Sequence, residues 1–151
     1  PPPPPPHTHP PPPPPPTPPN TLSLHDALPI SGEVIFGEKT GTDVGRGIAA
    51  DIDPNYRGFE MWSTANGNVY DCKGNIIATK NRPSVNFRVY WDGDLQDELL
   101  DGVKIDKWNG TKVNRMITLS DYSNAASCNS TKATPNLSAD IFGDWREEVI
   151  L

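Results

Sequence analysis

The sequence predicts an all-β protein whose body is a partial β-propeller, about two and a half four-stranded blades of a larger ring. Three observations lead to this fold class. The body reads as short apolar strands between turn signals, it has almost no helical periodicity, and an acidic motif recurs at a spacing typical of propeller blades.

The first part of the chain differs in composition from the rest. Fifteen of the 19 prolines lie within residues 1–19, and such a tract forms only an extended, solvated polyproline helix without a core. Residues 21–30 read TLSLHDALPI, which is similar to the translation of a common DNA sequencing adapter. We therefore interpret residues 1–31 as a non-native, disordered segment left by sequence assembly, and residues 32–151 as the body. A proline-rich ligand or linker is the alternative.

The charge balance excludes several classes of partner. The chain carries 13 basic and 19 acidic residues, a net charge of −6, whereas nucleic-acid binding requires a basic surface. No apolar run approaches the roughly 20 residues that span a bilayer. The sequence therefore predicts a protein that binds neither nucleic acid nor membrane. Two cysteines, Cys72 and Cys128, show no metal-ligand spacing, and whether they form a disulfide stays open.

Short strands account for nearly all of the body. The turn signals Asn66-Gly67, Lys73-Gly74-Asn75 and Asn109-Gly110 predict hairpins, because Gly and Asn accept the positive φ of tight primed turns. The predicted strands cover residues 47–51, 59–64, 68–72, 75–79, 86–91, 98–101, 103–108, 115–119 and 137–141, and a last one begins at Glu148.

An acidic motif recurs three times along the body. In each copy an apolar strand ends at an Asp, a second acidic residue follows, and after a turn a Glu opens the next strand. The first Asp residues of the copies, Asp51, Asp92 and Asp140, lie 41 and 48 residues apart, close to the roughly 40–50 residues of a propeller blade. A propeller closes with roughly four to eight blades, so residues 32–151 are predicted to be a fragment of a ring.

The acidic motif also predicts a metal. Its carboxylates are expected to converge on one point and to repel one another without a cation, and calcium takes about six to eight oxygen ligands. A single copy is more typical of solvated turn residues, whereas three copies at one place in a repeat favour structural Ca²⁺ between the first two strands of each blade. The predicted ligands are Asp51, Asp53 and Glu60 in the first copy, Asp92, Asp94 and Glu98 in the second, and Asp140, Asp144 and Glu148 in the third.

Four long stretches carry a resemblance to a known family. They read GTDVGRGIAADIDP at 41–54, PSVNF at 83–87, YWDGDL at 90–95 and TKATPNLSADIFGDWREEVI at 131–150. They resemble the rhamnogalacturonan lyases of polysaccharide lyase family 11, and the resemblance covers residues 32–151. It implies a fragment of an eight-bladed, calcium-rich propeller that cleaves the rhamnose–galacturonate bond of the pectic polysaccharide rhamnogalacturonan I by β-elimination. It also implies a monomeric bacterial protein that is secreted, periplasmic or on the cell surface.

The resemblance places the catalytic groups on Lys132 and Arg46. β-Elimination needs a base for the proton on carbon five of galacturonate, a cation for its carboxylate, and help for the leaving oxygen. Lys132 is the expected base, because a lysine loses its proton when it is desolvated or placed near other cations. Arg46 stays protonated and is expected to clamp the carboxylate or to stabilise the leaving group. A solvated surface lysine and a turn arginine are the alternatives.

The turn that contains Lys132 is also expected to bind the sugar. Asn129, Ser130 and Thr131 are the predicted substrate-binding residues. The family has glycine where this chain has Ser130. If that position has positive φ, the serine is strained by roughly 1–2 kcal/mol.

Other functions remain open at this point. One alternative is a non-catalytic, calcium-binding propeller for carbohydrate binding or adhesion, and another is an inactive fragment, because an open ring has an incomplete core. The pairing of Arg46 with residues 129–132 favours the lyase. Four tryptophans are able to stack on sugars, but their positions on strands and beside acidic loops favour packing between blades for most of them: Trp62, Trp91, Trp108 and Trp145.

Overall fold

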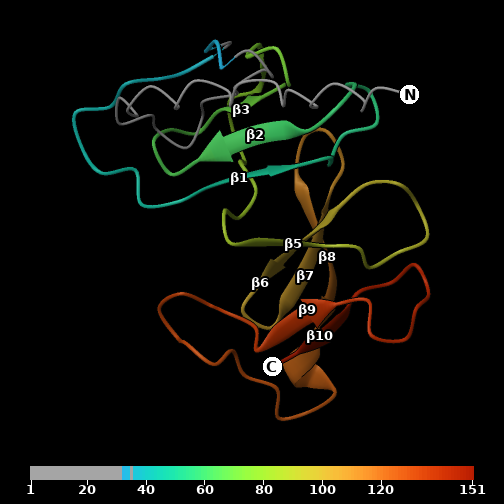
Figure 1. Cartoon of the computed structure of the whole chain (residues 1–151). Coiled ribbons are helices and arrows are strands. Elements are labelled where there is room, and N and C mark those ends of the chain that lie inside the picture. Colours follow the sequence, from blue (N-terminus) through green and yellow to red (C-terminus); the bar gives the residue numbers. More distant parts are fainter. Residues whose placement is uncertain (1–31, 35) are drawn as a thin grey trace, which may run out of the picture.

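The computed structural model describes residues 32–34 and 36–151, and the predicted foreign segment 1–31 lies outside them. Within the described part the chain is all-β, as predicted, with ten short strands and one three-residue 3-10 helix, η1 (Leu119–Asp121) (Figure 1). No helix in these residues combines the length and apolar character that crossing a membrane requires.

The strands form three antiparallel sheets, and within each sheet neighbours in sequence are neighbours in space. All ten predicted strands are confirmed, with ends that differ from the predicted ones by at most two residues. The first sheet contains β1 (Gly47–Ala50), β2 (Glu60–Ser63), β3 (Val69–Tyr70) and β4 (Ile76–Ala78); the second contains β5 (Phe87–Val89), β6 (Glu98–Asp101), β7 (Lys104–Trp108) and β8 (Val113–Thr118); the third contains β9 (Leu137–Ala139) and β10 (Glu148–Ile150).

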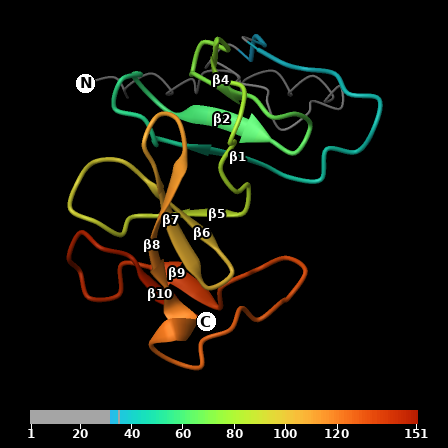
Figure 2. The same cartoon turned by 180° about the vertical axis from the view of Figure 1, so that it is seen from behind.

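The second sheet has buried side chains on both of its faces. Leu99 and Leu100 are neighbours on β6, so their side chains point to opposite faces of the sheet, and both are fully buried. Leu99 packs in a cluster with Trp62 of the first sheet, whereas Leu100 packs in a cluster that Val149 of the third sheet joins. The second sheet therefore lies between the other two, an order that Figures 1 and 2 show from opposite sides.

Two of the predicted turns close in different ways. Gly74 has a φ of 82°, and a Cβ atom there would lie 2.6 Å from the ring of Phe36, so both conformation and space require glycine. Gly67 does not have positive φ, and the prediction of a primed turn at this position is wrong. The side-chain oxygen of Asn66 instead accepts a 2.8 Å hydrogen bond from the N–H of Asn68, which closes the turn through a side chain.

The first hairpin of each sheet has the same register. The last residue of the first strand pairs with the glutamate that opens the second strand, in the pairs Ala50–Glu60, Val89–Glu98 and Ala139–Glu148. Counted from these pairs, Asp92 corresponds to Asp53 and not to Asp51. The glutamates therefore mark the structural repeat better than the first Asp of each motif.

Candidate functional site

The candidate residues form two groups, which lie at opposite ends of the first strand of each sheet. Arg46 and Asn86 directly precede β1 and β5, whereas the acidic motifs follow these strands. A strand rises about 3.3 Å per residue, so strands of three or four residues separate the two ends by roughly 10–13 Å. We call the first group the arginine end and the second group the acidic loops.

The arginine end brings together residues that lie before β1, before β5 and in the loop between β8 and β9. Nη1 of Arg46 donates a hydrogen bond to the side-chain oxygen of Asn86 and a second one, of 3.0 Å, to the main-chain carbonyl oxygen of Lys132. The amide nitrogen of Asn86 donates in turn to Oδ1 of Asp101. The two predicted catalytic residues, 86 positions apart in sequence, are therefore neighbours in the fold.

The backbone around Arg46 is held from both sides. Gly45 has a φ of 72°, and its N–H donates a 3.1 Å hydrogen bond to Asp43. On the other side, the N–H of Thr64 donates a 2.9 Å hydrogen bond to the carbonyl oxygen of Arg46. Arg46 borders an open hollow of about 240 Å³, lined by Gly45, Arg46, Gly47, Val85, Asn86 and Phe87.

Lys132 lies in a loop that Asn129 organises. The side-chain oxygen of Asn129 accepts hydrogen bonds from the hydroxyl of Thr131 (3.0 Å) and the N–H of Lys132 (3.1 Å). Its main-chain carbonyl accepts a third, from the N–H of Ala133 (2.6 Å). Asn129 therefore shapes the loop, and the Lys132 side chain is exposed at its tip.

The backbone strain expected in this loop falls on a different residue. Ser130 does not have positive φ, whereas Ala133 has a φ of 53°. The strain that positive φ would cause at Ser130 therefore does not arise. Ser130 instead borders an open hollow of about 480 Å³ that Asp101 and Lys104 also line.

The acidic loops share one hydrogen-bond pattern that the sequence did not reveal. In each loop, Oε2 of the motif glutamate accepts hydrogen bonds from two successive N–H groups, the second and third after the first strand. The bonds run from Ile52 (2.9 Å) and Asp53 (3.0 Å) to Glu60, from Trp91 (2.8 Å) and Asp92 (3.1 Å) to Glu98, and from Ile141 (2.8 Å) and Phe142 (3.4 Å) to Glu148.

In the first loop the glutamate keeps one oxygen unsatisfied. Glu60 is fully buried, and its Oε1 has no hydrogen-bond partner among the described residues. Burial raises the pKa of Glu60 to about 7; the charges of Asp51 and Asp53 act in the same direction, and the two backbone N–H groups oppose it. A buried carboxylate oxygen without a partner is costly, so this position favours a cation or a proton.

In the second loop a lysine supplies the cation. Oxygens of Asp92, Asp94 and Glu98 lie within 4.8 Å of one another, the one group of three carboxylates this close in the described part of the chain. Nζ of Lys107 binds all three, at 2.8 Å from Oε1 of Glu98. Burial lowers the pKa of Lys107, but these hydrogen bonds raise it by more, so the pKa of Lys107 lies above its ordinary value.

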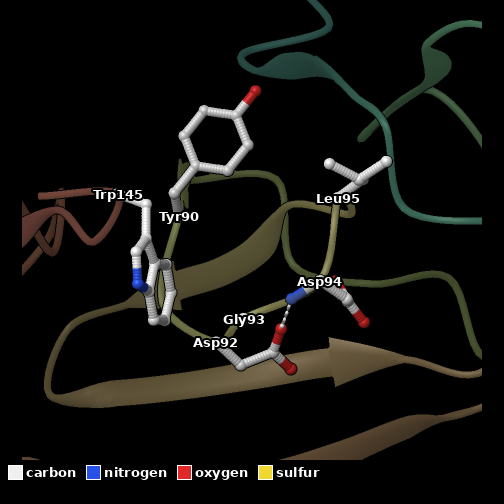
Figure 3. Close-up of a pocket in the computed structure, with 6 residues that line it drawn as sticks. All are labelled: Tyr90, Asp92, Gly93, Asp94, Leu95 and Trp145. Carbon is white, nitrogen blue, oxygen red and sulfur yellow. Dashed lines mark hydrogen bonds between the residues drawn. The ribbon is translucent and has the colours of Figure 1, made fainter.

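Figure 3 shows the surface of this second loop. Asp92 and Asp94 border a hollow of about 350 Å³, in which the N–H of Asp94 donates a 3.0 Å hydrogen bond to Asp92. Trp145 lies on one side of the hollow and Leu95 on the other, and Tyr90 and Gly93 complete the lining. The loop is therefore open to solvent beside its acidic group.

The third loop uses its carboxylates to shape its own turn. Oδ1 of Asp140 accepts hydrogen bonds from the N–H groups of Gly143 (2.6 Å) and Asp144 (3.0 Å), and Oδ1 of Asp144 accepts one from Arg146 (2.7 Å). The nine predicted ligands thus lie in three equivalent loops, but three carboxylates converge closely only in the second, within the residues described.

Two further acidic residues were missed by sequence reasoning. Asp97 and Glu147 directly precede a motif glutamate, and each binds the residue that follows the first strand of the preceding sheet. The carboxylate of Asp97 accepts a hydrogen bond from the N–H of Asp51 (2.9 Å), and Glu147 binds the N–H of Tyr90 (3.0 Å). The only sequence signal was an acidic pair, Asp97-Glu98 and Glu147-Glu148, in two of the three copies.

Most of the tryptophans pack inside the fold, as predicted. Trp62 and Trp108 are buried in the cluster between the first two sheets, and Trp91 packs against the other cluster. Trp145 differs, since 55% of its surface is exposed and the Arg146 guanidinium lies 5.0 Å from its ring.

Comparison with known proteins identifies close relatives. The chain is 52% identical over 132 residues to the rhamnogalacturonan endolyase YesW of Bacillus subtilis (strain 168), covering 85% of this chain and 20% of that protein. It is 43% identical over 147 residues to the rhamnogalacturonan exolyase YesX of the same organism, covering 87% and 24%. The chain therefore spans about a fifth to a quarter of the length of these curated relatives.

The fold agrees with the sequence comparison. The solved structure of the Bacillus licheniformis rhamnogalacturonan lyase PL11 matches 79% of this chain and 20% of that chain, with a TM-score of 0.72 at 51% identity. The family model of the C-terminal domain of rhamnogalacturonan lyase family 11 matches residues 17–151. This chain therefore belongs to rhamnogalacturonan lyase family 11 and matches its C-terminal domain.

Proposed function

We propose that the full-length protein is a polysaccharide lyase that cleaves the rhamnose–galacturonate bond of rhamnogalacturonan I by β-elimination. The observation that carries this proposal is the hydrogen bond from Arg46 to the main-chain carbonyl of Lys132, which joins a permanent cation to the loop that carries the candidate base. The relatives named above are rhamnogalacturonan lyases, and they support the same reaction class.

In the proposed reaction the two residues have distinct roles. Arg46 pairs with the galacturonate carboxylate, so the negative charge that develops when carbon five loses its proton is stabilised. Lys132 acts as the base that takes that proton. The bond between carbon four and the rhamnosyl oxygen then breaks, a carbon–carbon double bond forms between carbons four and five, and the oxygen leaves with the electron pair and receives a proton.

The geometry of Arg46 suits a carboxylate clamp. Its Nη1 is occupied by Asn86 and by the carbonyl of Lys132, and within the described residues Nη2 and Nε make no hydrogen bond. Two N–H groups of a planar guanidinium match the two oxygens of a carboxylate. We propose that Ser130 and Thr131 bind sugar hydroxyls beside this clamp and that Asn129 contributes by shaping the loop.

We also propose that Ca²⁺ is the metal of the acidic loops. Their donors are all oxygens, which hard divalent cations prefer. The first loop fits a cation because Oε1 of Glu60 is buried without a partner, and the second fits because its three carboxylates already surround the ammonium of Lys107. Because the acidic loops lie roughly 10–13 Å from the arginine end, we propose that these ions stabilise the fold and take no part in the reaction.

The proposal for the complete fold is an eight-bladed propeller. It is supported by the stacking of successive antiparallel sheets, each of which connects its strands in sequence order. One hydrophobic cluster joins the first sheet to the second, and another joins the second to the third. We further propose that the protein acts as an exported monomer, secreted, periplasmic or on the cell surface, since its substrate is a polymer outside the cell.

The test of the proposed function is the product formed from purified rhamnogalacturonan I by the full-length protein. A lyase produces an unsaturated galacturonate, detected by its ultraviolet absorbance and by mass spectrometry. Hydrolysis with a saturated product would exclude the mechanism. Binding without any cleavage would favour a carbohydrate-binding or adhesion propeller instead.

A further inference from the structure

We propose that Asn86 is a positioning residue for Arg46, and that Asp101 fixes the direction in which the Asn86 amide points. The inference rests on the proposed function, because it assigns Arg46 to the reaction. It adds two residues that lie outside the acidic loops and are proposed to act on the reaction through Arg46.

The orientation of the Asn86 amide follows from its partners. A carboxylate only accepts hydrogen bonds and a guanidinium only donates them. The NH₂ group of Asn86 must therefore face Asp101, and its oxygen must face Nη1 of Arg46, as the structure shows. Asp101 thus selects one of the two amide orientations, the one that presents an acceptor to the arginine.

The two residues stand on a rigid hairpin. Asn86 directly precedes β5, Asp101 is the last residue of β6, and the neighbouring register pair is Phe87–Leu100. Asn86 and Asp101 therefore lie opposite each other at the end of the sheet. A residue held by a sheet end is placed more accurately than one on a free loop.

The effect on Arg46 is to fix the plane of its guanidinium. Nη1 meets two acceptors, the Asn86 side chain from the second sheet and the carbonyl of Lys132 from the following loop. Rotation of the guanidinium breaks at least one of these hydrogen bonds. Its other edge, with Nη2 and Nε, is thereby directed away from the protein acceptors, where a carboxylate can be bound by two parallel hydrogen bonds.

A double-mutant cycle in the full-length protein tests the inference. Asn86→Ala is expected to lower kcat/KM on rhamnogalacturonan I by roughly 10- to 100-fold, as expected when a catalytic group is misplaced. In an Arg46→Ala background the same change is expected to have no further effect, because Asn86 acts only through Arg46. Asn114→Ala, an exposed asparagine on β8, is the matched control and keeps the wild-type rate.

A second pair of variants guards against a simple folding defect. Asn86→Asp places a second carboxylate beside Asp101 and is expected to lower the rate. When Asp101→Asn is added, the new amide at position 101 donates a hydrogen bond to the new carboxylate at position 86. That carboxylate still accepts from Arg46, so the double variant is expected to recover much of the activity. Unfolding midpoints measured for every variant identify any that lose activity by misfolding.

The outcomes separate the inference from the proposed function. No unsaturated product from the wild-type protein would overturn both. An active wild type that loses its activity with Arg46→Ala, but keeps it with Asn86→Ala, would overturn the inference alone. Additive losses from Arg46→Ala and Asn86→Ala, or no recovery in the Asn86→Asp/Asp101→Asn variant, would also overturn it.

Discussion

Asp97 of the second sheet holds the backbone of Asp51 in the first sheet with two hydrogen bonds. Its carboxylate accepts a 2.9 Å hydrogen bond from the N–H of Asp51, and its own N–H donates a 2.7 Å hydrogen bond to the Asp51 carbonyl. The other carboxylate oxygen binds Arg88 at 3.0 Å, and Asp97 is fully buried. This one residue therefore ties two successive sheets together beside the first acidic loop.

We predict that Asp97→Ala destabilises the full-length protein by about 2–4 kcal/mol. The substitution leaves the N–H of Asp51 without its acceptor and Arg88 without its partner, and a lost hydrogen bond to a charged group costs roughly 1.5–3 kcal/mol. Chemical denaturation measures the change. Asp121→Ala, at an exposed aspartate in η1, is the control and is expected to change stability by less than about 0.5 kcal/mol. Equal stabilities of the two variants would contradict the role of Asp97.

The second prediction concerns Glu60 in metal-free protein. Its folded pKa, raised from 4.5 to about 7 by burial and then by the charges of Asp51 and Asp53, lies above the unfolded value, so the folded state binds the proton more tightly. The glutamic acid is therefore accommodated without penalty below pH 4.5, and stability falls as the pH rises from about 4.5 to 7. The loss attributable to Glu60 is on the order of 3 kcal/mol.

Denaturation in the presence of a chelator, repeated across this pH range, tests the Glu60 prediction. Glu60→Gln removes the titration, so the variant is expected to show a flatter pH dependence than the wild type between pH 4.5 and 7. An unchanged slope would show that Glu60 does not titrate in this window.

The third prediction concerns the cation of the second loop. Lys107 occupies the point at which Asp92, Asp94 and Glu98 converge, so calcium has to displace it. Lys107→Met removes the competing ammonium and is expected to strengthen calcium binding at this loop at least tenfold, measured by calorimetric titration. Lys104→Met, an exposed lysine on the same strand, is the control and should leave the affinities unchanged. Weaker calcium binding by Lys107→Met would mean that the lysine helps to hold the loop for the ion.

The fourth prediction separates two neighbouring positions in the Lys132 loop. Ala133 has a φ of 53°, so Ala133→Gly is expected to stabilise the protein by about 1 kcal/mol through relief of backbone strain. Ser130 has no such strain, so Ser130→Gly is expected to give no gain. A larger gain at Ser130 than at Ala133 in thermal denaturation would contradict the observed loop conformation.

Much of the fold followed from local patterns in the sequence. Alternating apolar residues between turn signals gave all ten strands, because strand formation here depends on short hairpins and not on long-range pairing. Gly67 was interpreted wrongly, since the side chain of Asn66 closes that turn without positive φ. Equating the first Asp of each motif also misaligned the second copy by two residues, because only the strand register shows which positions are equivalent.

The candidate site was predictable in part. Resemblance to a family singled out Arg46 and Lys132, but their contact joins the residue before β1 to the loop between β8 and β9, which no local pattern contains. The roles of Asn86, Asp97 and Lys107 were not foreseen for the same reason. Each acts on a partner from another strand or sheet, so its function appears only after folding.

The measurement that tests the central claim most directly is the yield of unsaturated galacturonate from rhamnogalacturonan I with Lys132→Ala in the full-length protein. Lys112→Ala, at an exposed lysine outside the arginine end, serves as the control. The proposed mechanism predicts that Lys132→Ala abolishes the unsaturated product and retains the wild-type unfolding midpoint, while Lys112→Ala cleaves like the wild type. Undiminished formation of the product by Lys132→Ala would contradict the assignment of Lys132 as the base.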